Sequence, residues 1–69
     1  MDKKQLSRQL IQHCGGAKVI SCSQLETFLG FGHNKTLSLL EGVDALEING
    51  RRKYFTSDVA ERLLERMVR

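Results

Sequence analysis

The chain has 69 residues, of which 41% are hydrophobic, and it carries a formal net charge of +3. A chain of this length forms one small domain and buries only roughly 60% of its unfolded surface, so we do not expect a deep catalytic cavity. The mild basic balance fits a nucleic-acid partner without requiring one, and the positions of the charges are therefore more informative than their sum.

The two cysteines, Cys14 and Cys22, are too few for the disulfide frameworks that stabilise small secreted domains. No apolar run is long enough for a signal peptide or a membrane span. We therefore expect reduced thiols and a soluble, cytoplasmic protein with no membrane partner.

The first predicted element is a helix from Lys3 to Cys14. Its apolar residues recur at helical spacing and form one face: Leu6, Leu10, Ile11 and Cys14. Gly15-Gly16 then suits the left-handed backbone of a helix C-cap. We expect this helix to close the core, although its face also suits dimerisation. Residues 18–20 are β-prone and are predicted to form a strand that pairs with a later hairpin.

Two short helices joined by a glycine-containing turn follow. The first of them begins at a capping box, for which the chain offers two alternatives, Ser21 with Gln24 and Ser23 with Glu26. It is expected to end at Gly30. Its buried stripe is Leu25, Phe28 and Leu29.

The second of the two helices is predicted from Asn34 to Glu41, where Gly42 stops it. Leu37 and Leu40 are expected to face inward. The residues left on the exposed side are Lys35, Thr36 and Ser38.

A β-hairpin is predicted around Asn49-Gly50, because this dipeptide lies between two β-prone runs. A two-residue loop pairs apolar residues with cations, Ile48 with Arg51 and Leu46 with Lys53. A three-residue loop with a left-handed Gly50 instead pairs Leu46 with Tyr54 and Glu47 with Lys53. We favour the three-residue loop because its cross-strand pairs are chemically better matched.

The last predicted helix is capped by Thr56, Ser57 or Asp58. Its apolar stripe contains Val59, Ala60, Leu63, Leu64 and Met67. Its exposed side is expected to carry Glu61, Arg62, Glu65 and Arg66.

Three consecutive cations, Arg51, Arg52 and Lys53, stand at and beside the tip of the predicted hairpin. The simplest role for such cations is to keep the tip solvated and to discourage edge-to-edge strand pairing. Beside a helix-turn-helix, however, they are placed to neutralise phosphates and release counterions, and Arg52 also suits a narrow minor groove. We favour phosphate contact and include Asn49 and Tyr54 in the predicted DNA-binding set.

The second helix of the pair is the expected recognition helix. Asparagine bonds adenine through two contacts, lysine donates to guanine, and a threonine methyl group touches thymine. The predicted DNA-facing residues of this helix are His33, Asn34, Lys35, Thr36 and Ser38. The alternative is an ordinary polar surface on which Asn34 serves as the N-cap.

The residues do not predict an enzyme, a cofactor or a metal site. No nucleophile-elbow sequence surrounds any serine, and Gly30-Phe31-Gly32 lacks the third glycine of a nucleotide-binding loop. The residues from which a zinc site would have to be assembled match no finger spacing: His13, Cys14, Cys22 and His33.

From Ile20 to Met67 the chain resembles the winged-helix module shared by phage-type excisionases and the DNA-binding heads of MerR-type regulators. The segments that carry the resemblance are Leu29-Gly30-Phe31, Glu41-Gly42, Gly50-Arg51-Arg52 and Asp58-Val59. The chain departs from the family pattern in a turn that is one residue longer, in Ser38 where an arginine is often found, and in the extra helix from Lys3 to Cys14.

Pattern and resemblance together predict an α+β, mostly helical fold, a small winged helix-turn-helix domain with a two- or three-stranded wing. The single domain spans 1–69, with the additional N-terminal helix in 1–16 and the family-like module in 18–67. The resemblance implies binding to double-stranded DNA, as a transcription regulator or as an excisionase-type accessory factor of a mobile element. The rival is a protein-interaction or dimerisation module on the same fold, which docks through the N-terminal helix as a homodimer or onto another protein.

Overall fold

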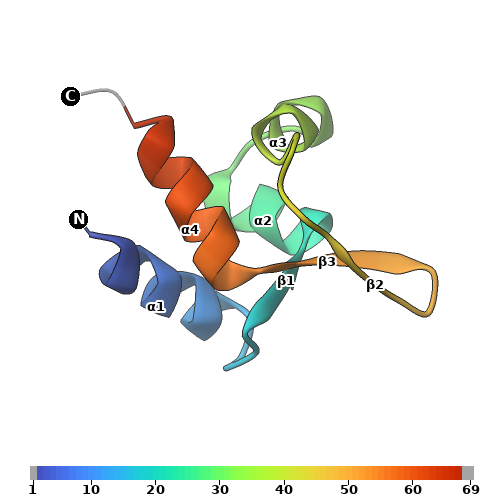
Figure 1. The fold of residues 1–69 in the computed structure, drawn as a ribbon, viewed down its shortest axis with the longest axis horizontal. Coiled ribbons are helices and arrows are strands. Elements are labelled where there is room, and N and C mark those ends of the chain that lie inside the picture. The colour runs from blue at the N-terminus through green and yellow to red at the C-terminus, as the bar shows by residue number, and fades with distance from the viewer. Residues whose placement is uncertain (1, 68–69) are drawn as a thin grey trace.

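The computed structural model describes residues 2–67, which form four helices and a three-stranded antiparallel sheet (Figure 1). The helices are α1 (Lys3–His13), α2 (Cys22–Leu29), α3 (His33–Leu39) and α4 (Thr56–Glu65). The strands are β1 (Val19–Ser21), β2 (Leu46–Ile48) and β3 (Arg51–Phe55). The fold is therefore α+β and mostly helical, as the sequence predicts, and the elements follow one another in the predicted order.

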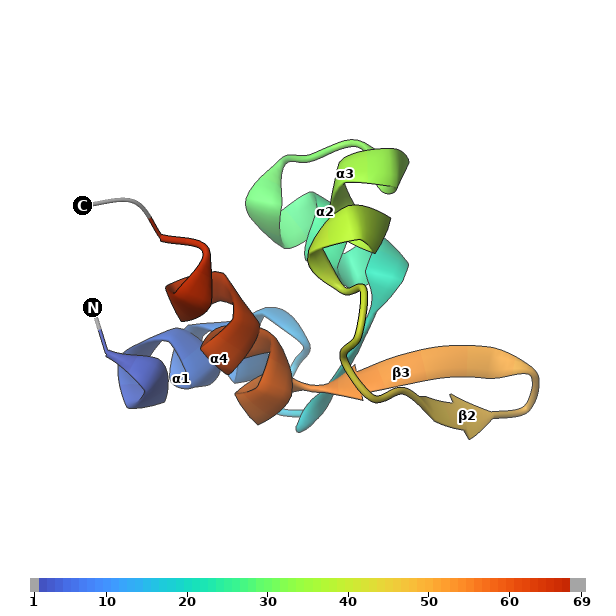
Figure 2. The same ribbon diagram turned by 45° about the horizontal axis from the view of Figure 1, so that its top comes forward.

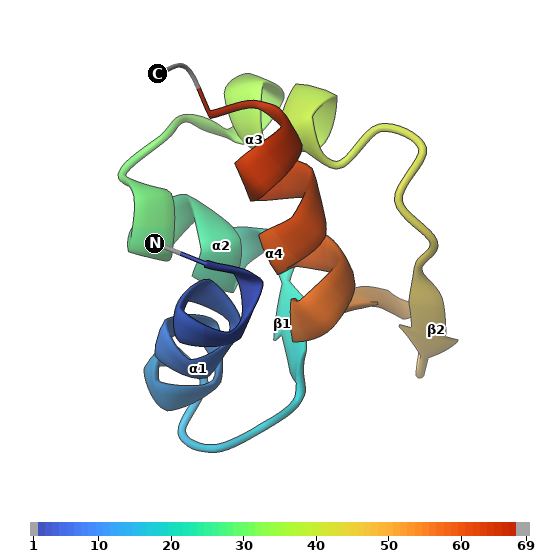
Figure 3. The same cartoon turned by 60° about the vertical axis from the view of Figure 1, so that its left-hand side comes forward.

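The first and last helices pack against each other and close the core, as expected. Leu6 and Leu10 of α1 are buried, as are Val59 and Ala60 of α4. Figure 3 shows α1 and α4 side by side, with β1 behind α4. Met67, by contrast, lies beyond the end of α4 and is half exposed, so its place in the predicted apolar stripe is wrong.

Helix α2 begins at the first of the two predicted capping boxes. The Ser21 hydroxyl accepts a hydrogen bond from the backbone of Gln24, and the Gln24 side chain accepts one from the backbone of Ser21. Gly30 ends the helix with φ of 72°, a left-handed conformation that glycine adopts without strain. The helix boundaries on both sides thus follow from local chemistry.

Helix α4 does not begin at a side-chain cap, contrary to prediction. Strand β3 runs directly into it, with Phe55 at the N-cap position and Thr56 as the first helical residue. Thr56 is buried, and both its backbone N–H and its hydroxyl donate to the carbonyl of Lys18. The Thr56 N–H and hydroxyl therefore join the end of β3 to the residue before β1. The hydroxyl is used in this contact and does not cap the helix.

The sheet has the strand order β1-β3-β2, with every neighbouring pair antiparallel. The predicted pairing of the early strand with the hairpin is confirmed by the register of Ile20 opposite Tyr54. These two side chains are buried against Leu10, Leu25 and the other core residues. The core therefore lies between the helices and one face of the sheet.

The hairpin between β2 and β3 has a two-residue loop, so our preference for the longer loop is wrong. Asn49 and Gly50 both have positive φ, at 52° and 76°, the pattern of a type I′ turn. Leu46 consequently pairs with Lys53 and Ile48 with Arg51. The turn sets the register because strand β2 is exposed along its whole length, and mismatched pairs cost little where nothing is buried.

Within residues 2–67, no helix is both long enough and apolar enough to cross a membrane.

Candidate nucleic-acid interface

Helix α3 begins at His33 with Gly32 at the N-cap, so Asn34 lies inside the helix and does not cap it. The orientation of the helix also differs from prediction. Leu40 faces inward as predicted, at 3% exposure, but Thr36 is fully buried and Leu37 is 44% exposed. Thr36 and Leu40 lie one turn apart, and the Thr36 hydroxyl donates to the carbonyl of Gly32 at 3.0 Å. This internal hydrogen bond lets a polar residue take the buried position.

The exposed face of α3 therefore carries His33, Asn34, Lys35, Leu37 and Ser38. The prediction that Thr36 contacts thymine is wrong, because its methyl group is buried inside the protein. The Lys35 ammonium lies over the Phe31 ring, 5.7 Å from its centroid. A cation–π contact of this kind holds the lysine beside the turn that precedes the helix.

Burial of Thr36 leads to a direct prediction. Replacing Thr36 with serine keeps the hydroxyl and removes one buried methyl group, so the free energy of unfolding should fall by about 1 kcal/mol. The affinity of the folded protein for DNA should not change. Denaturant unfolding measures the first quantity and fluorescence anisotropy with a labelled duplex measures the second. A loss of affinity without a loss of stability would return Thr36 to the DNA-binding set.

The two faces of the hairpin carry different side chains. Arg52 points to the same side of the sheet as the buried Tyr54, because residues two apart on a strand share a face. Arg51 and Lys53 lie on the other side, together with the exposed apolar residues Leu46, Ile48 and Phe55. The three cations thus flank the hairpin on both sides. Tyr54, at 6% exposure, belongs to the core and not to the predicted contact surface.

Helix α3 and the hairpin line one hollow. Leu37 and Ser38 of α3 line it together with Arg52 and Tyr54 of β3 and the loop between the two elements. Figure 2 shows the same relation, with α3 above the base of the hairpin and the tip projecting away from the body. The predicted recognition helix and one of the three cations therefore face a common concave surface.

Ser38 also borders a second hollow on the other flank of α3. This one is lined by Phe31, Lys35, Leu39 and Arg66 in addition to Ser38. Arg66 is the cation that follows α4, and it adds a positive charge beside Lys35. The sequence placed Arg66 on an exposed surface but gave no sign that this surface adjoins α3.

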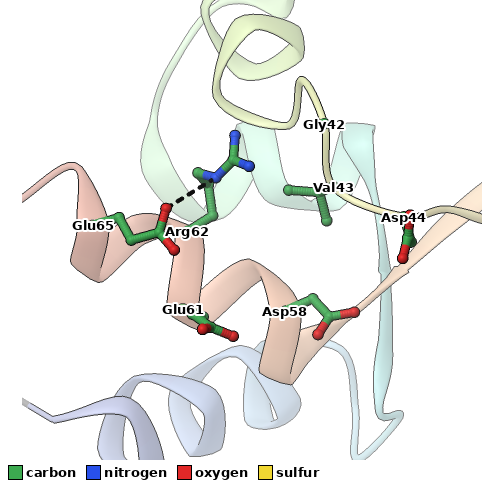
Figure 4. A pocket seen from close by; sticks show the side chains of 7 residues that line it. All are labelled: Gly42, Val43, Asp44, Asp58, Glu61, Arg62 and Glu65. Carbon is green, nitrogen blue, oxygen red and sulfur yellow. Dashed lines mark ion pairs between the residues drawn. The ribbon is translucent and has the colours of Figure 1, made fainter.

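A third hollow, between α4 and the loop that follows α3, is acidic (Figure 4). Its charged residues are Asp44, Asp58, Glu61, Glu65 and Arg62. Four carboxylates against one guanidinium make this surface repulsive to phosphates. Acidic side chains thus predominate in the hollow beside α4.

Arg62 is not a free surface cation, contrary to prediction. Its side chain is only 20% exposed, and its Nη1 donates to the backbone carbonyls of Leu39 and Glu41 at the end of α3. Its Nε lies 3.6 Å from a carboxylate oxygen of Glu65 (Figure 4). A guanidinium at the carbonyl end of a helix satisfies acceptors that have no partner within the helix. Arg62 therefore holds α3 against α4.

His33 makes its contact within the protein, across the turn between α2 and α3. Its Nδ1 lies 3.0 Å from Oε2 of Glu26, and the thiol of Cys22 donates to the same oxygen at 3.4 Å. The hydrogen bond from His33 lowers the pKa of Glu26, while burial and the neighbouring Glu26 raise the pKa of Cys22. Neither His13 nor Cys14 belongs to this group of potential ligands. The His13 ring instead packs edge-on against Phe28.

Comparison of the chain with family models, with curated proteins and with solved structures finds no match.

Proposed function

We propose that the protein binds double-stranded DNA as a winged helix-turn-helix domain. In this proposal α3 enters the major groove and the β2–β3 hairpin is the wing that contacts neighbouring phosphates. The observation that carries the proposal is the hollow shared by the exposed side of α3 and Arg52 of the wing. An α-helix with its side chains is about 10–12 Å across, which suits a major groove about 12 Å wide.

Asn34, Lys35 and Ser38 are the residues of α3 that we propose to contact bases. Each is exposed, and each offers hydrogen-bonding groups that match base edges in the major groove. Leu37 is exposed beside them and is suited to apolar contact with a thymine methyl group, which the buried Thr36 cannot reach. His33 contributes less, because its ring nitrogen is already paired with Glu26.

The wing supplies the phosphate contacts in this proposal. Arg51 and Arg52 are both exposed, and Lys53 is partly so. Arg52 has Glu47 directly opposite on the same face, which offsets part of its charge, whereas Arg51 lies opposite the neutral Ile48. We therefore expect Arg51 to contribute more than Arg52 to the attraction of phosphates. In the cell such a protein would be a transcription regulator or an excisionase-type accessory factor.

The proposal is tested by titrating random-sequence duplex DNA with the protein at low salt. Non-specific binding by proteins of this class has a dissociation constant of about 10⁻⁴–10⁻⁶ M even at physiological salt. We therefore expect retardation in a gel, or a rise in anisotropy, at micromolar protein. Unretarded DNA under these conditions would contradict the proposal.

A second prediction concerns sequence preference. Once a preferred site has been selected from a randomised pool, Asn34→Ala should reduce discrimination between that site and a single-base variant by about 1–3 kcal/mol. Binding to random duplex should be nearly unchanged, because Asn34 carries no charge. Competition titrations measure both quantities. An Asn34→Ala protein that keeps full discrimination would remove this residue from base recognition.

The rival function, a protein-interaction module, is favoured by one specific observation. Leu46, Ile48 and Phe55 are each at least 40% exposed and lie on one face of the sheet. Exposed apolar groups that gather on one surface are typical of protein contacts. This surface is a better docking site than α1, which uses Leu6 and Leu10 to close the core. Replacing Ile48 and Phe55 with serine separates the two functions, since only partner binding should be lost.

A further inference from the structure

Three potential metal ligands meet at the junction of α2 and α3. Cys22 and Glu26 are one helical turn apart on α2, and His33 is the first residue of α3. Their ligand atoms, Sγ, a carboxylate oxygen and a ring nitrogen, all lie within 4.8 Å of one another. The chain turns back between the two helices through Gly30, whose left-handed backbone brings His33 over the side of α2.

The spacing of these atoms is close to that required by a tetrahedral metal ion. At metal–ligand distances of about 2.0–2.3 Å, the ligands of a tetrahedral site lie roughly 3.3–3.7 Å apart. The Nδ1–Oε2 distance is 3.0 Å and the Sγ–Oε2 distance is 3.4 Å. The third pair, Nδ1 and Sγ, lies within 4.8 Å, and rotation of the exposed His33 side chain can bring these two atoms closer so that an ion fits between the three groups.

The chemistry of the three groups selects the kind of ion. A thiolate, an imidazole and a carboxylate together suit Zn²⁺, which accepts sulfur, nitrogen and oxygen ligands in four-coordinate sites. Ca²⁺ and Mg²⁺ prefer six or more oxygen ligands. The exposed fraction rises from 26% for the Glu26 side chain to 64% for that of His33, so the group is open to solvent on one side. A water molecule can then complete the coordination.

We propose that Cys22, Glu26 and His33 form a zinc-binding site that fastens α2 to α3. On binding, the Cys22 thiol releases its proton to solvent and its sulfur takes a metal bond. The hydrogen bonds that Glu26 now receives from Cys22 and His33 are replaced by coordination of all three side chains. The ion would act as a cross-link over the turn and would stabilise the folded state by an amount that rises with the logarithm of the free zinc concentration once that exceeds the dissociation constant. The site does not depend on DNA binding.

Titration with Co²⁺, which takes the place of Zn²⁺ in such sites, tests the proposal without any functional assay. Cobalt bound to a thiolate gives an intense charge-transfer absorption, so the band reports direct ligation by cysteine. Wild-type protein should develop this band up to one equivalent of Co²⁺, and Zn²⁺ should abolish it by displacement. A wild-type protein that gives no band with millimolar Co²⁺ would overturn the proposal.

Matched variants assign the ligands. Cys22→Ser should remove the band, whereas Cys14→Ser, which removes the other cysteine, should keep it. Glu26→Gln and His33→Ala should each weaken metal binding at least about tenfold, because loss of a mere supporting partner already costs 10–100-fold. His13→Ala is the control for His33→Ala. Retention of full affinity by Glu26→Gln and His33→Ala, or loss of the band in Cys14→Ser, would contradict the three-residue site.

Thermal unfolding provides a second readout that does not need a coloured metal. With free Zn²⁺ at 100 times its dissociation constant, the Tm of a domain of this size should rise by roughly 10–20 °C. The same rise is expected for Cys14→Ser and none for Cys22→Ser. Circular dichroism confirms that each variant is folded before metal is added. A Tm of wild-type protein that does not respond to zinc means that the three side chains form only a hydrogen-bonded link.

Discussion

Alanine at both Arg51 and Arg52 should weaken binding to every duplex sequence and reduce its dependence on salt. If the wing and α3 together engage about four phosphates, log affinity falls with log salt with a slope of about −3 to −4. Removal of two contacts lowers the slope to about −2. Counterion release contributes nothing at about 1 M salt, so we take the two proteins to bind equally there. At about 0.1 M salt the variant should then bind roughly 60-fold more weakly than the wild type. Anisotropy titrations at several salt concentrations measure both quantities.

The matched control removes two cations from another part of the surface. Lys4 and Arg8 are exposed on α1, and Figure 1 shows this helix on the side of the molecule opposite the hairpin tip. Alanine at both positions lowers the net charge by the same amount as the wing variant. We expect the slope to stay within about half a unit of the wild-type value. Equal losses in the two variants would mean that net charge alone drives binding and that the wing has no special part.

Arg62→Ala should produce the second large effect, a loss of stability centred on α3. The substitution removes the donor that serves the carbonyls of Leu39 and Glu41, and the partly buried carbonyl of Leu39 then lacks this hydrogen bond. Hydrogen bonds from a charged group are worth about 1.5–3 kcal/mol, so we expect a loss of about 2 kcal/mol and a fall in Tm of roughly 8–16 °C. Thermal and denaturant unfolding measure the change.

Arg66→Ala is the control for this prediction. Arg66 is an exposed arginine one turn further along the chain from Arg62, and its replacement should change stability by less than about 0.5 kcal/mol. In Arg62→Ala, hydrogen exchange should accelerate most in α3, because the guanidinium joins the end of that helix to α4. Uniform acceleration across α1 and α2 would show that Arg62 supports the whole core and not the position of α3.

Most elements of the fold could be predicted because their signals are local. The capping residues around Ser21, the left-handed Gly30 and the Asn49-Gly50 turn each depend on neighbours within a few positions. The loop length was wrong because we judged the register by the match of cross-strand side chains. That criterion has weight only where a face is buried, and β2 is exposed throughout.

The orientation of α3 could not be predicted because it depends on how the helix packs against the rest of the protein, α2 above all. Thr36 lies inside and Leu37 outside, and the hydroxyl of Thr36 donates to the carbonyl of Gly32. Hydrophobicity alone favours Leu37 over Thr36 at the buried position. In a helix of only seven residues the periodic signal is too short to correct the error.

In the candidate sites, too, features that depend on consecutive residues could be predicted, and features that depend on tertiary packing could not. The basic wing is visible in three consecutive letters of the sequence, although the alternation of Arg52 with Arg51 and Lys53 between two faces required the strand register. The group of Cys22, Glu26 and His33 was missed because Glu26 was considered only as a capping residue. Its closeness to His33 depends on the angle between two helices, which the sequence does not specify.

The central claim is that the exposed side of α3 and the wing form one DNA-binding surface. NMR spectra of ¹⁵N-labelled protein during titration with a short duplex test this claim most directly. The largest changes in amide chemical shift should fall in residues 33–38 and 49–53, with little change along α1 or around the acidic hollow of α4. Changes confined to α1 and α4, or no saturable change with duplex in excess, would contradict it.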